Sequence, residues 1–120
     1  MPVIANQKTI TLQEVGNLLE AEVLFGDDLS IKAGEFGAAD LMSDVLALSK
    51  PGMLLLTGLM NPQVIRTAIV ADLCGVVFVR GKKPGDSILS LAREAGIPVL
   101  GTSFTMFEAA GRLYQAIHGR

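Results

Sequence analysis

Between residues 50 and 118, short apolar runs alternate three times with longer amphipathic segments, and this alternation constrains the fold more than any other feature of the sequence. The runs MLLLTG, GVVFVR and IPVLGT have the length and composition of buried strands. The segments after them, PQVIRTAIVADL, KKPGDSILSLAREAG and MFEAAGRLYQAIH, are predicted helices. Strands and helices in this order form a parallel sheet through right-handed crossovers. We therefore predict an α/β fold with a mostly parallel sheet, βα repeats and flanking helices.

Residues that favour helix ends support these boundaries. An N-cap side chain accepts hydrogen bonds from the first turn, proline fits the first helical position, and glycine ends a helix. The predicted end residues are Asn61 and Pro62 for the first helix, Pro84 or Asp86 and Gly96 for the second, and a Thr105 and Glu108 capping box for the third.

The N-terminal part has less regular patterning. Here a capping box predicts a helix, two β-rich pieces flank a Gly-Asp-Asp turn, and a Gly- and Ala-rich segment indicates close backbone approach or a packing loop. A later Ser-Asp pair is a further predicted helix cap. These features are Thr11 and Glu14 before a helix at 12–19, pieces at 22–25 and 29–33, the segment 34–39, and Ser43 and Asp44.

Length and composition bound the class of protein. The 120 residues fit one domain, 1–120. Only 18% of the residues are charged and 50% are hydrophobic, which predicts that a partner covers part of the surface, as in a homodimer. A net charge of −2 argues against nucleic-acid binding. No apolar run has the length of a membrane span, and we expect no secretion signal. The single Cys74 fits a reducing compartment, so we expect a cytoplasmic protein.

Ligands of open α/β sheets bind at the carboxyl ends of the strands. Three predicted loops meet at that edge, and they contribute hydroxyls, helix N-termini and three cations within four positions. Such an edge can hold an anion; alternatively, its polar residues only end helices and the basic loop is a solvated turn. The candidate ligand residues are Thr57, Gly58, Asn61, Arg80, Gly81, Lys82, Lys83, Thr102, Ser103 and Thr105.

No catalytic signature occurs in the chain. There is no phosphate-binding Walker loop, no GxGxxG, no GxSxG and no Cys/His cluster. The one histidine, His118, is expected at a helix end, and Asp27 and Asp28 lack a third metal ligand. Cys74 has no histidine partner and is expected to be a buried, unreactive thiol. We therefore expect no catalytic residue, metal or cofactor, and no enzymatic activity.

A family resemblance is carried by the segments SKPG, LLLTG, FVRGKKP, GIPVL and TMFEAAGRL. Residues 12–113, which contain these segments, resemble the DRTGG domain. This family occurs as a stand-alone protein, beside CBS domains in regulated pyrophosphatases and in some phosphotransacetylases. More distantly, the sequence is similar to the N-terminal domain of the HPr kinase/phosphorylase. The resemblance implies a dimeric, non-catalytic interaction or sensing module.

The sequence departs from the family motif at two places. Leu59-Met60 and Asn61-Pro62 stand where many members carry Asp-Arg, and Arg80-Gly81-Lys82 stands where they carry Thr-Gly-Gly. Apolar residues at a loop tip favour a packing contact. We predict a regulatory module that self-associates or binds a partner protein, with a sensor for a nucleotide or phosphorylated metabolite as the alternative. The predicted interface residues are Gly37, Ala38, Leu59 and Met60.

Overall fold

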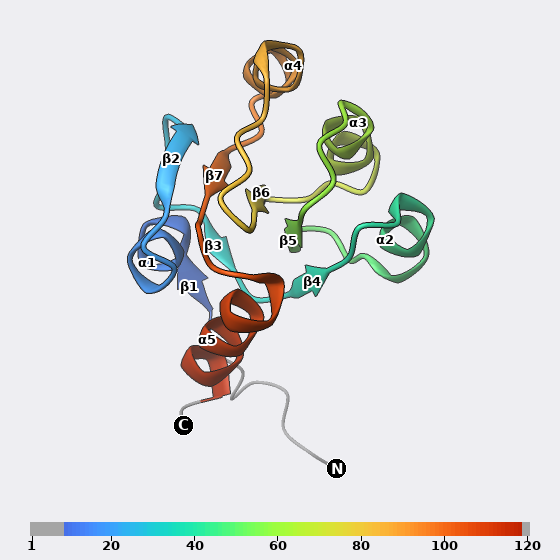
Figure 1. Ribbon diagram of the computed structural model, residues 1–120. Coiled ribbons are helices and arrows are strands. Elements are labelled where there is room, and N and C mark those ends of the chain that lie inside the picture. Colours follow the sequence, from blue (N-terminus) through green and yellow to red (C-terminus); the bar gives the residue numbers. More distant parts are fainter. Residues whose placement is uncertain (1–8, 119–120) are drawn as a thin grey trace.

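The computed structural model describes residues 9–118, and a five-stranded sheet in the order β2-β7-β6-β5-β4 forms its centre (Figure 1). Strands β4 (Phe36–Ala38), β5 (Leu54–Thr57), β6 (Gly75–Phe78) and β7 (Val99–Gly101) are parallel. At the other edge, β2 (Glu22–Phe25) pairs antiparallel with β7. The predicted α/β class with a mostly parallel sheet is confirmed.

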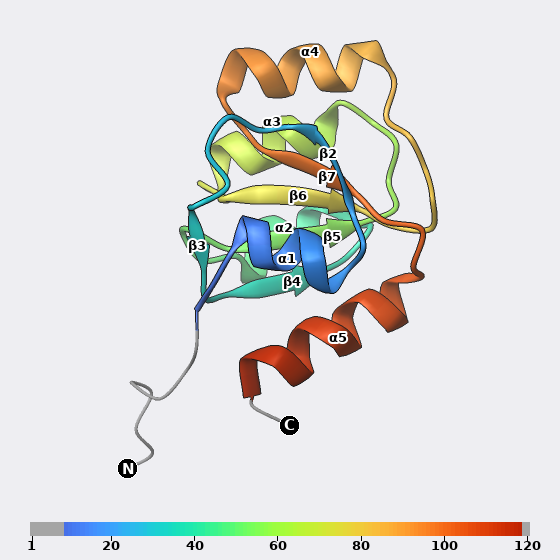
Figure 2. The same cartoon turned by 90° about the vertical axis from the view of Figure 1, so that its left-hand side faces the viewer.

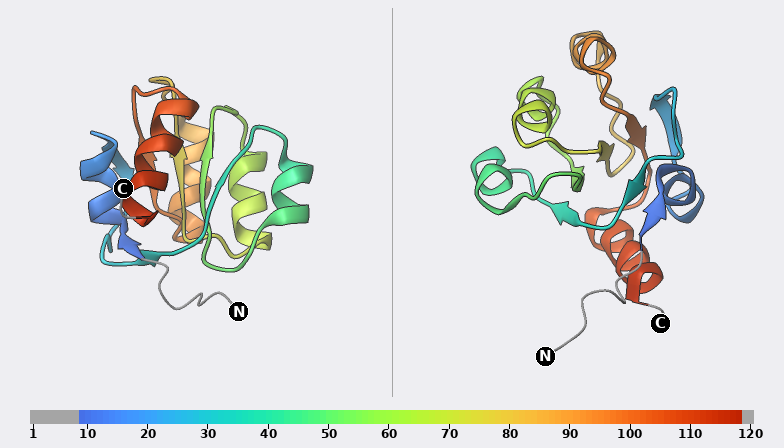
Figure 3. Two further views of the ribbon diagram at one scale, coloured as in Figure 1. Left: turned by 90° about the horizontal axis from the view of Figure 1, so that it is seen from below. Right: turned by 180° about the vertical axis from the view of Figure 1, so that it is seen from behind.

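Helices cover both faces of this sheet. Helices α2 (Met42–Leu48), α3 (Gln63–Val70) and α4 (Asp86–Ala95) lie on one face (Figure 1). Helices α1 (Leu12–Leu18) and α5 (Met106–His118) lie on the other, as the views from below and behind also show (Figure 3). A small antiparallel pair of β1 (Ile10–Thr11) and β3 (Lys32–Ala33) adjoins α1.

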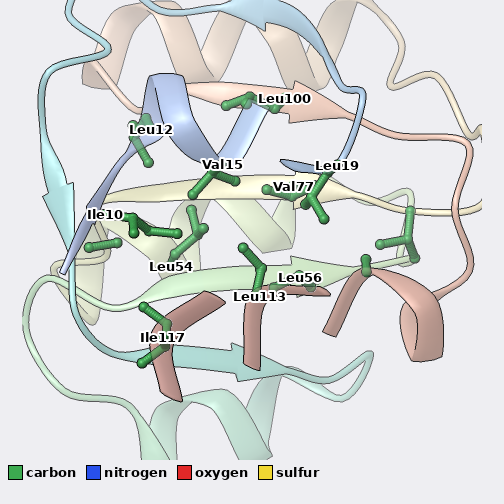
Figure 4. Packing of buried hydrophobic residues seen from close by; sticks show 13 residues of the cluster. Ile10, Leu12, Val15, Leu19, Leu54, Leu56, Val77, Leu100, Leu113 and Ile117 are labelled. Atoms are coloured by element: carbon green, nitrogen blue, oxygen red, sulfur yellow. The ribbon is translucent and has the colours of Figure 1, made fainter. Parts of the chain in front are cut away.

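Every residue of the central strands β5 and β6 is buried, because helices cover both faces of the sheet. In β5, Leu54 and Leu56 enter the cluster formed with α1 and α5, and Figure 4 shows them among its side chains. Leu55 points the other way, into the cluster formed with α2, α3 and α4. Successive side chains of a strand alternate between faces, so a continuous aliphatic run serves two cores.

Several predicted helix ends are confirmed. The Thr11 hydroxyl accepts from the Glu14 N–H at 3.1 Å, and the Glu14 carboxylate accepts from the Thr11 N–H at 2.8 Å, which completes the capping box of α1. Helix α3 begins one residue later than predicted, with Pro62 as its N-cap, and Asn61 Oδ1 accepts from the Gln63 N–H at 2.8 Å just before it. Gly96 ends α4 in the left-handed conformation, with φ of 71°.

Two predicted caps are wrong in detail. Helix α2 starts at Met42, before Ser43 and Asp44, and its N-cap Leu41 provides no side-chain bond. At α5 the Thr105 hydroxyl accepts from the Glu108 N–H at 3.2 Å, but the Glu108 carboxylate accepts from Arg112 Nε at 2.8 Å. Arg112 therefore competes successfully for the carboxylate that the second half of the capping box needs.

The piece predicted as a strand at 29–33 is a strand only at Lys32–Ala33. The carbonyls of Leu29 and Ile31 accept instead from the first N–H groups of α1, at 3.0 Å from Gln13 and 2.9 Å from Leu12. Those N–H groups have no partner inside the helix, so the preceding loop satisfies them. A tertiary contact thus displaces the expected strand.

Strand β4 was not predicted from the sequence. Its three residues, Phe-Gly-Ala, lie within the segment for which a close approach or packing loop was expected. The close approach is confirmed, because a Cβ atom on residue 37 would lie 2.9 Å from Met53 Cε. The segment is a strand because it pairs in register with β5, from Phe36 opposite Leu54 to Ala38 opposite Leu56.

Candidate functional site

The loops after β5, β6 and β7 meet at the carboxyl edge of the parallel strands, where the arrowheads of β5 and β6 point in Figure 2. Direct hydrogen bonds join them. The Arg80 N–H donates to the Phe104 carbonyl at 2.7 Å, and the Gly81 N–H donates to the Thr102 carbonyl at 2.9 Å. Lys82 Nζ donates to the Gly58 carbonyl at 3.0 Å. The structure therefore brings together the three loops that the sequence predicted at one edge.

Most of the predicted hydroxyl and amide groups are already used within the chain. Thr102 is buried, and its hydroxyl donates to the Leu19 carbonyl and accepts from the Phe104 N–H. The side chains of Asn61 and Thr105 accept from backbone N–H groups at the starts of α3 and α5. Ser103 is exposed at the same edge. For Asn61 and Thr105, these contacts support the alternative in which polar residues of the edge only end helices. The hydroxyl of Thr102 is used to attach α1 to the sheet.

The side chains of Arg80, Asp40 and Lys82 all contact Gly58 at this edge. A Cβ atom on residue 58 would lie 2.6 Å from Arg80 Nη2, so the guanidinium packs directly on the glycine. The Gly58 N–H donates to Asp40 Oδ1 at 2.8 Å, and its carbonyl accepts from Lys82. Two side chains of opposite charge thus satisfy the backbone of this buried glycine.

Asp40 also belongs to this site, although the sequence did not predict it. Its Oδ1 also accepts from the hydroxyl of the fully buried Thr57, at 3.1 Å. Asp40 reaches the edge because it follows β4, which is parallel to β5. An acidic residue just after a predicted strand would have indicated this position. Because β4 was not predicted, Asp40 was not recognised as a candidate.

The three cations of the second loop separate in space. Arg80 and Lys82 converge on Gly58, whereas Lys83 pairs with Glu22 at 2.9 Å. Both partners of that ion pair are exposed, so it adds little to stability. Among residues 9–118, neither Arg80 nor Lys82 forms an ion pair with a carboxylate.

The turn that presents these cations is left-handed. Arg80 has φ of 65° and Gly81 has φ of 70°. Glycine adopts this conformation freely, but for arginine it costs about 1 to 3 kcal/mol. The two inter-loop hydrogen bonds of Arg80 and Gly81 to Phe104 and Thr102 hold the turn against that cost.

The four predicted interface residues lie in two places. Leu59 and Met60 are half-buried and pack against the core cluster beneath α2, α3 and α4. Gly37 and Ala38 lie on β4, at the edge of the sheet, and Ala38 is exposed. Hollows of about 310 Å³ and 190 Å³ flank β4 on its two sides, toward α5 and α2 respectively.

The remaining candidate groups are not part of this edge. Cys74 is half-buried against the core, and burial raises the pKa of its thiol to about 11, as expected for an unreactive thiol. His118 ends α5, where its ring lies 4.2 Å from that of Tyr114. Within residues 9–118, acidic, histidine and cysteine side chains form no group of three suited to a metal, and no helix is long and apolar enough to cross a membrane.

The protein is thus a three-layer α/β domain in which the loops at the carboxyl ends of the strands are joined around the buried Gly58. The chain belongs to the DRTGG domain family, because the model of that family matches residues 14–116. The family resemblance found in the sequence is thereby confirmed.

A solved structure has the same fold. It contains the CBS and DRTGG domains of the regulatory region of Clostridium perfringens pyrophosphatase, complexed with the activator diadenosine tetraphosphate. The TM-score is 0.75 at 18% sequence identity, and the match covers 89% of this chain. It covers 47% of the other chain, so this chain spans about half the length of that regulatory region. Among curated protein sequences, no significant match was found.

Proposed function

We propose that this chain is a non-catalytic regulatory module that self-associates as a homodimer through the outer edge of β4. The observation that carries the proposal is the unpaired side of this strand. Within the described residues, β4 pairs only with β5. An open strand edge presents backbone donors and acceptors that a second strand can satisfy.

The hydrogen bonds of β4 indicate which groups face outward. The Glu35 carbonyl accepts from the Leu54 N–H at 2.9 Å, and the Ala39 N–H donates to the Leu56 carbonyl at 3.1 Å. Backbone groups of successive residues in a strand point to opposite sides. Those of Phe36 and Ala38 therefore point away from β5, available to an antiparallel copy of the same strand.

Apolar side chains beside β4 enlarge the surface that such a dimer would bury. Leu48 on α2 is 78% exposed and Tyr114 on α5 is 67% exposed, and each lines one of the two hollows that flank β4. In a two-fold dimer the same residues of both copies meet, so both faces of the extended sheet would gain apolar contacts. A three-residue strand alone would bury too little area for a stable dimer.

The chain 1–120 acts as one DRTGG-like unit in the cytoplasm, without a membrane or nucleic acid, and a partner protein takes the place of the second copy where one is present. Its composition and the regulatory region in which its structural neighbour lies support these points.

Sedimentation velocity on wild type and two variants tests the dimer. Wild type at about 100 μM should sediment as a dimer. Ala38→Lys places a charge at the centre of the proposed contact and should give a monomer, because edge lysines oppose strand pairing. Val23→Lys is the matched control: Val23 is 42% exposed on β2, at the opposite edge, and this variant should remain dimeric. A monomeric wild type, or a dimeric Ala38→Lys protein with a native circular dichroism spectrum, would rule out this interface.

The convergence of Arg80 and Lys82 on Gly58 favours a second candidate function, the sensing of a phosphate-bearing anion. Neither cation has an acidic partner in the described part of the chain, and Lys82 uses one of its three donors on Gly58. The structural neighbour was complexed with an anionic nucleotide, which agrees with this function.

Thermal-shift measurements with inorganic pyrophosphate and ATP test the sensor. A ligand at about 100 times its Kd stabilises a protein by roughly 2.7 kcal/mol. The double substitution Arg80→Ala and Lys82→Ala should abolish the shift. Lys83→Ala, which removes a cation of the same loop that is paired with Glu22, should preserve it. A shift that survives the double substitution would place the anion elsewhere.

A further inference from the structure

The carboxylate of Asp40 occupies the donors that an anionic ligand at Gly58 would need. A single oxygen, Oδ1, accepts both the Gly58 N–H at 2.8 Å and the Thr57 hydroxyl at 3.1 Å. A backbone N–H and a hydroxyl at the carboxyl end of a parallel strand are common ligands of phosphate oxygens. The chain therefore supplies its own oxyanion to this position.

The cations at the same glycine leave this carboxylate unpaired. Arg80 packs on the Cα side of Gly58 and Lys82 bonds its carbonyl, but within residues 9–118 neither forms an ion pair with Asp40. Arg80 and the two spare donors of Lys82 thus stay available to a ligand, while the donors next to them are filled. Arginine and lysine at one point suit a group with several negative oxygens, such as a pyrophosphate.

We propose that Asp40 is a built-in competitor for the anion site at Gly58, and that a ligand with a phosphate or pyrophosphate group binds by displacing it. The proposal rests on the second proposed function, anion sensing, and specifies its regulation. A phosphate oxygen takes over the N–H of Gly58 and the hydroxyl of Thr57, and its charge faces Arg80 and Lys82. Asp40 swings toward solvent, which is open to it because the residue is exposed.

Such a competitor sets the ligand concentration at which the site responds. Binding must break two hydrogen bonds to Asp40 and place a second negative charge near its carboxylate, and both effects weaken affinity. Removing the charge of Asp40 should therefore tighten binding. A residue with only a structural role at Gly58 would give weaker or unchanged binding when substituted.

Isothermal titration calorimetry with inorganic pyrophosphate on four proteins tests the proposal. Asp40→Asn keeps an acceptor for Gly58 but removes the charge, and Asp40→Ala removes both; each should bind pyrophosphate about tenfold more tightly than wild type, a difference of about 1.4 kcal/mol. Asp28→Asn is the matched control. Asp28 also accepts from a backbone N–H, that of Ser30 at 2.9 Å, but it lies in the turn between β2 and β3, so the same charge change there should leave the Kd unchanged.

An NMR titration of wild type supplies a second readout that does not depend on a variant. The amide resonance of Gly58 should shift on addition of pyrophosphate, because its acceptor changes from carboxylate to phosphate. Equal affinities of wild type and both Asp40 variants, or an unshifted Gly58 amide, would overturn the role of Asp40 while leaving an anion site in place. No binding by any of the four proteins would overturn the anion site itself and this inference with it.

Discussion

The hydroxyl of Thr102, directly after β7, donates a 2.6 Å hydrogen bond to the carbonyl of Leu19, directly after α1. Both residues are buried. The bond joins the start of the chain to the carboxyl edge of the sheet, 83 positions further along the sequence. One of the predicted ligand residues thereby serves to attach α1 to the sheet.

Thr102→Val should lower the free energy of unfolding by about 1 to 3 kcal/mol, because the Leu19 carbonyl and the Phe104 N–H lose a buried partner. Valine has the same shape, so packing is retained. Urea unfolding measures the loss. Ser103→Ala, at the exposed neighbouring position, should change stability by less than about 0.5 kcal/mol. Equal effects of the two substitutions would contradict the assigned role.

Thr67→Val should have the opposite sign. Within the described residues, the buried Thr67 hydroxyl on α3 has no hydrogen-bond partner. Burying a polar group without a partner is unfavourable, so its replacement by a methyl group should raise the free energy of unfolding by about 1 kcal/mol. The same urea experiment measures this gain. A loss of stability would mean that the hydroxyl is bonded in solution.

Gly58→Ala should be destabilising only while Arg80 is present. Gly58 is not among the glycines with positive φ, so alanine fits its backbone, but the new Cβ would meet Arg80 Nη2 at 2.6 Å. In an Arg80→Ala background, Gly58→Ala should be neutral or stabilising by about 0.4 to 1 kcal/mol. A double-mutant cycle should therefore give a coupling free energy of about 1 kcal/mol. Additive effects would show that the guanidinium does not rest on Gly58 in solution.

Cys74 should make stability fall at high pH. Burial raises the pKa of its thiol to about 11, above the value of about 8.5 in an unfolded chain. The folded state then holds the proton more tightly, so this contribution to stability is complete below pH of about 8.5 and is lost as the pH rises toward about 11. Urea unfolding across this range should show a steeper loss for wild type than for Cys74→Ala. At pH 8 the native thiol should also react with a disulfide reagent more slowly than the unfolded chain does.

The fold was largely predictable because its main signals are local. The buried strands β5, β6 and β7 are continuous apolar runs, and the helices after them carry recognisable end residues such as Asn61 and Gly96. Strand β4 has no such signal. Phe-Gly-Ala lacks β-branched residues, and only its pairing with β5 makes it a strand.

The candidate site was predictable in position but not in detail. Parallel topology alone brings the three loops to one edge of the sheet. The division of the cations between Gly58 and Glu22 depends on which side chain each can reach. The place of Asp40 beside Gly58 depends on the register of β4.

The sequence by itself determined the α/β class, the alternation of strands and helices along the chain, and the family. Hydrophobic periodicity and helix ends are properties of neighbouring residues, so they can be recognised without the tertiary structure. Only the tertiary structure decided that β4 forms an open sheet edge, that Thr102 attaches α1, and that Asp40 fills the donors at Gly58. Each of these depends on residues at least 17 positions apart in the chain, whose meeting is set by packing and strand register.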